Sequence, residues 1–458
     1  MAGRRRWPER RRRARRRRPR SPRRRARVRY SWTDRDVELL EPDRTLLVWF
    51  AEVGEHATTI WANFQDVDPG AALVEISVRP AVFYPERSHV DYITVRGFEL
   101  AQAATPWAPP TADQPGLVGP NWAKGWIIED NLVRDSKCAG VSLGKNAATG
   151  DGFASERDAP IDVTIEHNLI HDTTLGIWLD WQVQGTRVTR NLLFDNIRDL
   201  FVEVAHGPTV VDHNVLASPV AIELFSQGNA FVNNLVLGAV RVQPVLDRAT
   251  PYHVPHSTQI AGYAFVYGGD DRYVGNLFVG SGEDVYGPDA PFLGEDTVPA
   301  CGTSAYAAAP GSWDEYLARV TSGGVGDHSR FHREWQPAYV WSNAYADGAR
   351  PVAFERSPRS VVGGRARVVV EEGTVWLESD LPAALVEPCR VPAVSNDLGR
   401  VRIAAAEFDA ADGSPLVIGT DLVGTVKDPG TSYPPGPLAH LPAGPARTLL
   451  WGDDAQAV

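Results

Sequence analysis

The chain has 458 residues, of which 43% are hydrophobic, enough for one large domain with a continuous core and a smaller module. No run of about 18 apolar residues exists, which excludes a transmembrane helix. The first 30 residues hold 17 of the 46 basic residues and one of the 57 acidic residues, so the rest of the chain carries a net charge of −27. This negative charge opposes binding to nucleic acid, anionic membranes and polyanionic substrates, but it does not oppose binding to neutral sugars.

Residues 1–30 form an arginine-rich tail, which we expect to be disordered and to which we assign no function. The tail lacks the apolar core of a secretory signal, so we expect a cytoplasmic protein. The three cysteines, Cys138, Cys301 and Cys389, lie far apart and form no CxxC pair, which favours reduced thiols over disulfides or a zinc site. The oligomeric state is left open, with a homo-oligomer among the alternatives.

The segment 31–89 is rich in predicted strands. Residues 45–53 and 72–83 have strand-like composition, and a polar stretch, 58–70, separates them. We interpret this segment as a candidate part of a β-sandwich that it would form together with strands from the C-terminal end of the chain.

An asparagine recurs after short β-branched strands between residues 90 and 345. The positions are Asn131, Asn168, Asn191, Asn214, Asn234 and Asn276, with spacings of 37, 23, 23, 20 and 42 residues. A period of 20–23 residues is typical of one coil of a parallel β-helix, and the longer intervals indicate coils with excursions. The side-chain amides would then form an internal ladder, and we interpret these asparagines as structural.

Two carboxylates occupy the same position in successive repeats. Asp180 follows Asn168 by twelve residues, and Glu203 follows Asn191 by twelve. Strand-like alternation points both acids away from the apolar face, and adjacent strands lie about 4.7–4.9 Å apart. Retaining glycosidases hold their two carboxyl groups roughly 5–5.5 Å apart and inverting enzymes roughly 6.5–9.5 Å, so the stacked acids favour retention. The alternative is that both acids are ordinary solvated surface.

Aromatic and polar residues near the acids favour a sugar-binding site over solvated surface. Trp178 and Phe201 share the face of the acids, and Trp181 and His206 follow them. Excursions at 104–124, 144–160, 242–269 and 282–311 are expected to wall a pocket. The candidate substrate-binding residues of these excursions are Trp107, Trp122, Asp247, Arg248, His253 and His256. No acidic or cysteine motif accompanies the two excursion histidines, so we expect no metal site.

The C-terminal part begins with a predicted helix and continues with strands. Residues 312–320 are typical of an amphipathic helix that a serine caps. Residues 346–458 lack the asparagine marker and alternate strands with Gly and Pro turns, which predicts an antiparallel β-sandwich after the parallel β-helix of residues 90–345. The predicted fold class is therefore all-β.

At GIWLDWQVQGTRV and DLFVEVAHGP the sequence resembles glycoside hydrolase family 120, the β-xylosidases built on a right-handed parallel β-helix with a β-sandwich domain. TTIWANFQDVDPG, SKCAGVSLGK and LDRATPYHVPHST also look like segments of that family. The resemblance implies a retaining exo-glycosidase that needs no cofactor and releases xylose from xylo-oligosaccharides. It also implies that Asp180 is the nucleophile and Glu203 the general acid/base.

Three alternatives stay open at this point. Family members carry further coils and a third acid where this chain has only residues 146–158. The first alternative is therefore an enzyme whose catalysis is impaired by the missing coils, in which Asp151 or Glu156 partly substitutes for the third acid. A non-catalytic carbohydrate-binding protein is the second. A polysaccharide lyase is the third, but such enzymes need an acidic calcium site and a basic residue, and no Arg or Lys cluster surrounds Asp180.

Overall fold

The computed structural model describes residues 49–64, 67–107, 112–144, 159–280, 300–322 and 326–452. The chain divides into two compact units, Met1–Val78 and Arg79–Val458. The described part of the first unit contains an antiparallel pair of strands, β1 (Trp49–Val53) and β2 (Thr58–Ala62).

The prediction of a strand at 72–83 is wrong. This stretch has no extended ladder, apart from an isolated bridge at Phe83, and the side chains of Leu73, Ile76 and Val78 are exposed. Strand β2 instead lies in the stretch that was predicted to be a polar connection. Alternating apolar residues favour a strand, but a strand also needs a partner for its backbone hydrogen bonds, and here β1 finds its partner only a short turn away.

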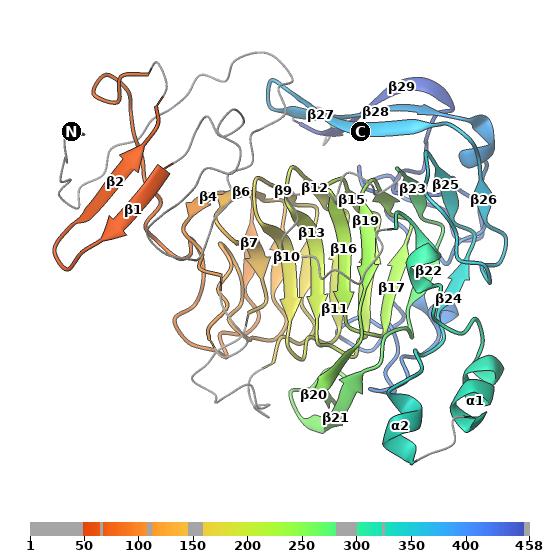
Figure 1. Cartoon of the computed structure of the whole chain (residues 1–458). Coiled ribbons are helices and arrows are strands. Elements are labelled where there is room, and N and C mark those ends of the chain that lie inside the picture. The colour runs from red at the N-terminus through yellow and green to blue at the C-terminus, as the bar shows by residue number, and fades with distance from the viewer. Residues whose placement is uncertain are drawn as a thin grey trace. The chain divides into compact units, whose positions relative to one another are not determined.

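Three parallel sheets dominate the second unit (Figure 1). The eight-stranded sheet contains β3 (Thr94–Arg96), β5 (Ile127–Glu129), β8 (Thr164–Glu166), β11 (Thr186–Thr189), β14 (Thr209–Asp212), β17 (Asn229–Val232), β22 (Arg272–Val274) and β24 (Tyr339–Trp341). The nine-stranded sheet contains β4 (Glu99–Ala103), β6 (Leu132–Ser136), β9 (Leu169–His171), β12 (Leu192–Phe194), β15 (Val215–Leu216), β18 (Leu235–Val236), β23 (Leu277–Val279), β25 (Ala344–Ala346) and β26 (Arg359–Ser360). The five-stranded sheet contains β7 (Ala139–Ser142), β10 (Leu175–Asp180), β13 (Arg198–Glu203), β16 (Val220–Phe225) and β19 (Ala239–Val242).

The chain visits the three sheets in turn. From β8 to β19 each repeat adds one strand to the eight-stranded, the nine-stranded and then the five-stranded sheet, and every new strand pairs with the one a repeat earlier. The registers match the predicted period, because Ile177 pairs with Leu200 and Val188 with Val211. The predicted all-β class with parallel strands is confirmed.

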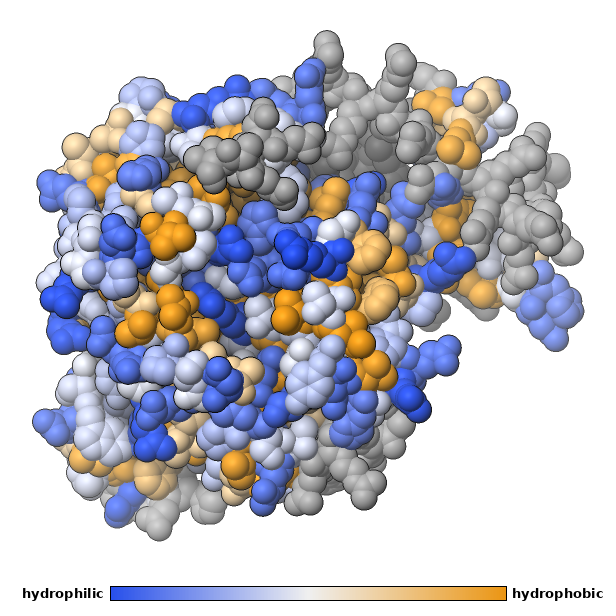
Figure 2. Space-filling view, turned by 180° about the vertical axis from the view of Figure 1, so that it is seen from behind, coloured by the Kyte–Doolittle hydropathy of each residue, from blue (hydrophilic) through white to orange (hydrophobic). Residues whose placement is uncertain are grey.

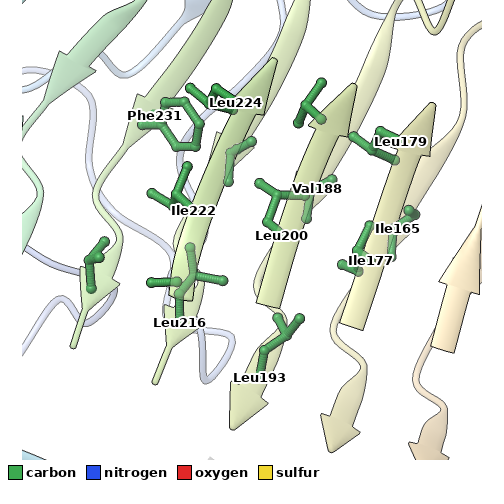
Figure 3. Close-up of a cluster of buried hydrophobic side chains, with 14 of the residues drawn as sticks. Ile165, Ile177, Leu179, Val188, Leu193, Leu200, Leu216, Ile222, Leu224 and Phe231 are labelled. Carbon is green, nitrogen blue, oxygen red and sulfur yellow. The ribbon is translucent and has the colours of Figure 1, made fainter. Parts of the chain in front are cut away.

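The core lies between the three sheets. Ile177 and Leu179 from β10 and Leu200 from β13 are fully buried and point inward beside Ile222 from β16 (Figure 3). Side chains alternate along a strand, so the residues between these positions point to the opposite face. That alternation sends Trp178 and Asp180 away from the core.

A continuous ladder of asparagine side chains runs through the coils. Each Nδ2 donates to the Oδ1 of the next member at 2.9–3.0 Å, and the members are Asn131, Asn168, Asn191, Asn214, Asn234, Asn276 and Asn343. Asn343 then donates to Oε1 of Glu355 at 2.9 Å. The predicted ladder is confirmed. The residue before each asparagine takes the left-handed conformation, as His167 (φ 50°) and Arg190 (φ 55°) do.

The C-terminal residues form one antiparallel sheet of β27 (Arg365–Glu371), β28 (Thr374–Leu381) and β29 (Gly444–Trp451). Its apolar side chains pack on the nine-stranded sheet, where Leu377 and Leu450 join one buried cluster with Leu192 and Leu235. The two sheets lie one above the other in Figure 1. Residues 401–418, part of the region predicted to alternate strands with turns, make only isolated bridges. In the described part of the chain, short 3₁₀ helices occupy Thr303–Tyr306, Ala383–Leu385 and Ser395–Leu398.

The predicted helix is confirmed as α1 (Trp313–Ser322), and α2 (Asp327–Phe331) follows it. Oγ of Ser312, the N-cap residue, accepts a hydrogen bond from the backbone N–H of Glu315 at 3.1 Å. The Glu315 carboxylate in turn accepts the N–H of Gly311, the residue before the cap, at 2.9 Å. In the described ranges no helix is long and apolar enough to cross a membrane. The space-filling view shows hydrophobic and hydrophilic residues interspersed on one face of the molecule (Figure 2).

Candidate active site

The two predicted acids end neighbouring strands of the five-stranded sheet. Asp180 is the last residue of β10 and Glu203 the last of β13, and the two are register partners. After each acid the backbone turns through a left-handed residue, Trp181 (φ 51°) and Val204 (φ 43°). The Trp181 N–H donates to the carbonyl of Glu203 at 3.1 Å, so the ladder holds both strand ends together. The predicted stacking of the two acids is confirmed.

Both acids are more enclosed than outward-facing residues usually are. The exposed fraction is 3% for Asp180 and 16% for the Glu203 side chain. The Glu203 carboxylate accepts hydrogen bonds from Trp178 Nε1 and from the Arg248 guanidinium, both at 3.2 Å. Burial raises the pKa of Glu203, while Arg248 and the Trp178 hydrogen bond oppose this rise. The site therefore favours a Glu203 that can carry a proton.

A third buried acid lies one coil further along the sheet. Glu223 pairs in register with Phe201, is fully buried, and contacts Arg198 at 2.9 Å and Arg241 at 2.5 Å. Its negative charge adds to the upward shift of the Glu203 pKa. Glu223 was not predicted as a site residue, although it stands between Ile222 and Leu224 as Glu203 stands between Val202 and Val204. That alternation was the available signal.

Aromatic rings continue the face that carries the acids. Trp178 and Phe201 stack with ring centroids 6.2 Å apart and an interplanar angle of 9°, and Phe225 meets Phe201 edge-on at 5.3 Å. Arg198 lies over Phe201 and Arg241 over Phe225. Trp178 and Phe201 are buried, with exposed fractions of 3% and 6%, and pack with Leu175 in one cluster beside the carboxylates.

A β-hairpin, β20 (Val245–His253) with β21 (Ile260–Val266), forms the excursion after β19. The excursion was predicted here, but its two strands were not. Trp181 and Val204 pack with Val245 and Val266 of the hairpin in one buried cluster, which also contains the fully buried Trp122. The hairpin therefore packs directly on the residue after each acid.

Two of the predicted histidines are buried and bonded to protein atoms. His206 Nε2 donates to the Thr250 carbonyl at 3.0 Å, and Nδ1 accepts from the Gln227 amide at 2.8 Å. Burial lowers the pKa of His206 to about 4 and also lowers the pKa of His253. His253 contacts the side chain of Gln182, two residues after Asp180, at 3.2 Å. Both rings therefore hold the hairpin against the strand ends.

Three other predicted residues are bonded elsewhere or exposed. His256 contacts Asp162 at 2.9 Å and Asp409 at 3.3 Å, and these carboxylates raise its pKa against the opposing effect of burial. Asp247 and Trp107 are exposed. Asp151 and Glu156, the proposed substitutes for the third acid, lie outside the described residues. Among the described residues, no group of three His, Cys, Asp or Glu side chains could hold a metal ion.

Comparisons with known proteins place the chain in a family of glycoside hydrolases. The profile of the insertion domain of glycoside hydrolase 120 matches residues 14–76, a range that includes part of the arginine-rich tail. A solved structure described as the complex of XylC with xylose is 38% identical, with a TM-score of 0.67, and the match covers 92% of this chain and 76% of that chain. No match was found among curated proteins. The chain belongs to glycoside hydrolase family 120 and is a glycoside hydrolase.

Proposed function

We propose that the protein is a retaining exo-β-xylosidase that releases xylose from xylo-oligosaccharides. The observation that carries this proposal is the register pair of Asp180 and Glu203 at the ends of adjacent parallel strands. Strands in a sheet lie about 4.7–4.9 Å apart, close to the roughly 5–5.5 Å that a retaining mechanism needs. The similarity to XylC, a protein described with xylose, supports the choice of sugar.

In this mechanism Asp180 attacks the anomeric carbon while Glu203 gives its proton to the departing oxygen. The glycosyl ester on Asp180 is then hydrolysed by water, from which Glu203 takes a proton. Burial raises the pKa of Glu203, which suits the first step, in which it must be protonated. The Trp178 hydrogen bond fixes the Glu203 carboxylate in one orientation.

The fold that we propose for this site is a right-handed parallel β-helix. Support comes from the regular order in which the chain adds one strand to each of three parallel sheets. We further propose that the sheet of β27, β28 and β29 belongs to a sandwich domain, and its packing on the nine-stranded sheet supports this assignment.

Hydrolysis of p-nitrophenyl β-xyloside tests the proposed function. We expect release of xylose that is initially the β anomer by NMR, and a loss of activity of at least about 10³-fold in Asp180→Ala. The matched control is Asp195→Ala, which removes an exposed carboxylate from the adjoining coil and should retain activity. Equal activity in wild type and Asp180→Ala would overturn the proposal.

A carbohydrate-binding protein without turnover is the second candidate. The sequence leaves it open, because residues 146–158 stand where members of the family carry further coils. Isothermal calorimetry with xylose and xylobiose distinguishes the two: binding without release of xylose supports the second candidate.

A further inference from the structure

The hairpin of β20 and β21, which packs on the residue after each acid, has an irregular register. Val245 pairs with Val266 and Thr250 with Ala264, so the four residues 246–249 on β20 face the single residue Phe265 on β21. Bulges of this kind redirect side chains and are common next to active sites. Arg248 lies in this bulge.

Both ends of the bulge are fixed to the strand ends that carry the acids. On one side Val245 and Val266 pack against Trp181 and Val204. On the other side the Thr250 carbonyl accepts the hydrogen bond from His206. The position of Arg248 is therefore tied to the same backbone that positions Asp180 and Glu203.

The Arg248 guanidinium bridges the two strand ends. It lies 5.3 Å from the centre of the Trp181 ring, and Nη2 donates to Oε1 of Glu203 at 3.2 Å. A cation over an indole ring is attracted to it, so Trp181 restricts Arg248 to this position.

The charged groups that act on Glu203 differ in what they can do during a reaction. Asp180 is its register partner, Arg248 is bonded to it, and Glu223 acts on it from β16. Glu223 is paired with Arg198 and Arg241, so its local charge stays constant. Asp180 alone would lose its charge during catalysis, because the glycosyl ester is neutral.

We propose that Arg248 is a positioning residue that converts Glu203 from an acid into a base between the two steps of hydrolysis. The inference rests on the proposed function. In the free enzyme the charge of Asp180 opposes that of Arg248 and leaves Glu203 able to hold its proton. In step one an Asp180 oxygen bonds to the anomeric carbon, the bond to the leaving oxygen breaks, and the Glu203 proton moves to that oxygen.

Arg248 then acts on the intermediate without opposition from Asp180. An adjacent cation favours the ionised form of a carboxyl group, so Glu203 stays a carboxylate that can take a proton from water. The water oxygen bonds to the anomeric carbon, the bond to Asp180 breaks, and the Asp180 charge returns. The returning charge again favours a protonated Glu203, which closes the cycle.

Kinetics with 2,4-dinitrophenyl β-xyloside tests this role, because its leaving group needs no proton and turnover reports the second step. We expect Arg248→Met to lower kcat at least about tenfold, azide to restore much of that loss, and Arg248→Lys to retain most of kcat. With p-nitrophenyl β-xyloside, the alkaline limb of kcat/KM in Arg248→Met should move up by about one pH unit or more. Arg190→Met is the matched control, because it breaks an Arg–Glu pair of 2.6 Å on the eight-stranded sheet and should change neither quantity.

Titration of the Glu203 carboxyl by ¹³C NMR, with Glu203→Gln identifying the signal, measures the same effect without turnover. A higher Glu203 pKa in Arg248→Met supports the proposal even if wild type cleaves no xyloside, in which case only the proposed function fails. The role of Arg248 alone is overturned if wild type is active and Arg248→Met has the wild-type Glu203 pKa, the wild-type alkaline limb and the wild-type kcat. Arg248→Lys provides the same comparison if the Met variant does not fold.

Discussion

Nδ2 of Asn191 donates a hydrogen bond to Oδ1 of Asn214 at 3.0 Å, although 23 residues separate them in sequence. The same Asn191 side chain accepts both the backbone N–H and the Nδ2 of Asn168, each at 2.9 Å. All three side chains are fully buried. Each asparagine thus joins three successive coils and aligns the strands that end in Asp180 and Glu203.

Replacement of Asn191 by Ala should destabilise the protein by about 3 kcal/mol or more, because two donors of Asn168 lose their acceptor in a site without water access. Urea unfolding of wild type and variant measures the difference. Asn396→Ala is the control, since this asparagine is exposed and its loss should change stability by no more than about 0.5 kcal/mol. A similar cost for both variants would contradict the structural role of the ladder.

The coil period could be read from the sequence because one residue type recurs at one turn. Asn343, the last member of the ladder, was missed because 67 residues that include α1 and α2 separate it from Asn276. The acid pair followed from the same period. Its enclosure did not, because the hairpin strands that cover it contain a bulge that interrupts their alternation.

The surroundings of the acids were predicted in part. Trp178 and Arg248 contact Glu203 directly, as expected of residues at the site. Trp122 was predicted to wall a pocket and His206 to bind substrate beside the acids. Trp122 packs with Val245 and Val266 of the hairpin, and His206 bonds to its Thr250 carbonyl. Sequence spacing indicates which strand end a residue follows, but whether that residue meets ligand or protein depends on which distant excursion packs on it.

The stereochemistry of azide products should distinguish the two acids. Asp180→Ala with azide and 2,4-dinitrophenyl β-xyloside should give α-xylosyl azide, because azide replaces the missing nucleophile on the same face. Glu203→Ala should give β-xylosyl azide, because azide replaces water in the second step, which then needs no base. NMR of the products measures both outcomes. Products of the same anomeric configuration from both variants would contradict the assignment.

His206 should make the protein sensitive to acid. Burial lowers its folded-state pKa from 6.5 to about 4, so between these values the unfolded chain binds a proton that the folded protein does not. Stability from this group is complete above about pH 6.5 and is lost as the pH falls towards 4. At 1.36 kcal/mol per pKa unit, wild type should lose about 3 kcal/mol more than His206→Gln between pH 7 and pH 4.

Urea unfolding at several pH values tests this expectation. Buried Asp199, whose pKa burial raises to about 6, has the opposite dependence but is present in both proteins and cancels in the comparison. Parallel curves of stability against pH for wild type and variant would show that His206 is not the sensitive group.

The three cysteines should be unreactive in the folded protein. Cys138, Cys301 and Cys389 are free and buried, with exposed fractions of 3%, 2% and 9%. Burial raises the pKa of Cys138 to about 11 and that of Cys301 to about 12, and it also raises that of Cys389. Thiolate is the reactive form, so both access and ionisation oppose reaction at pH 8. Ellman's reagent should therefore titrate fewer than one thiol per chain in buffer and all three in 8 M urea. Rapid reaction of one thiol in buffer would contradict this expectation and show that the structure around that cysteine opens.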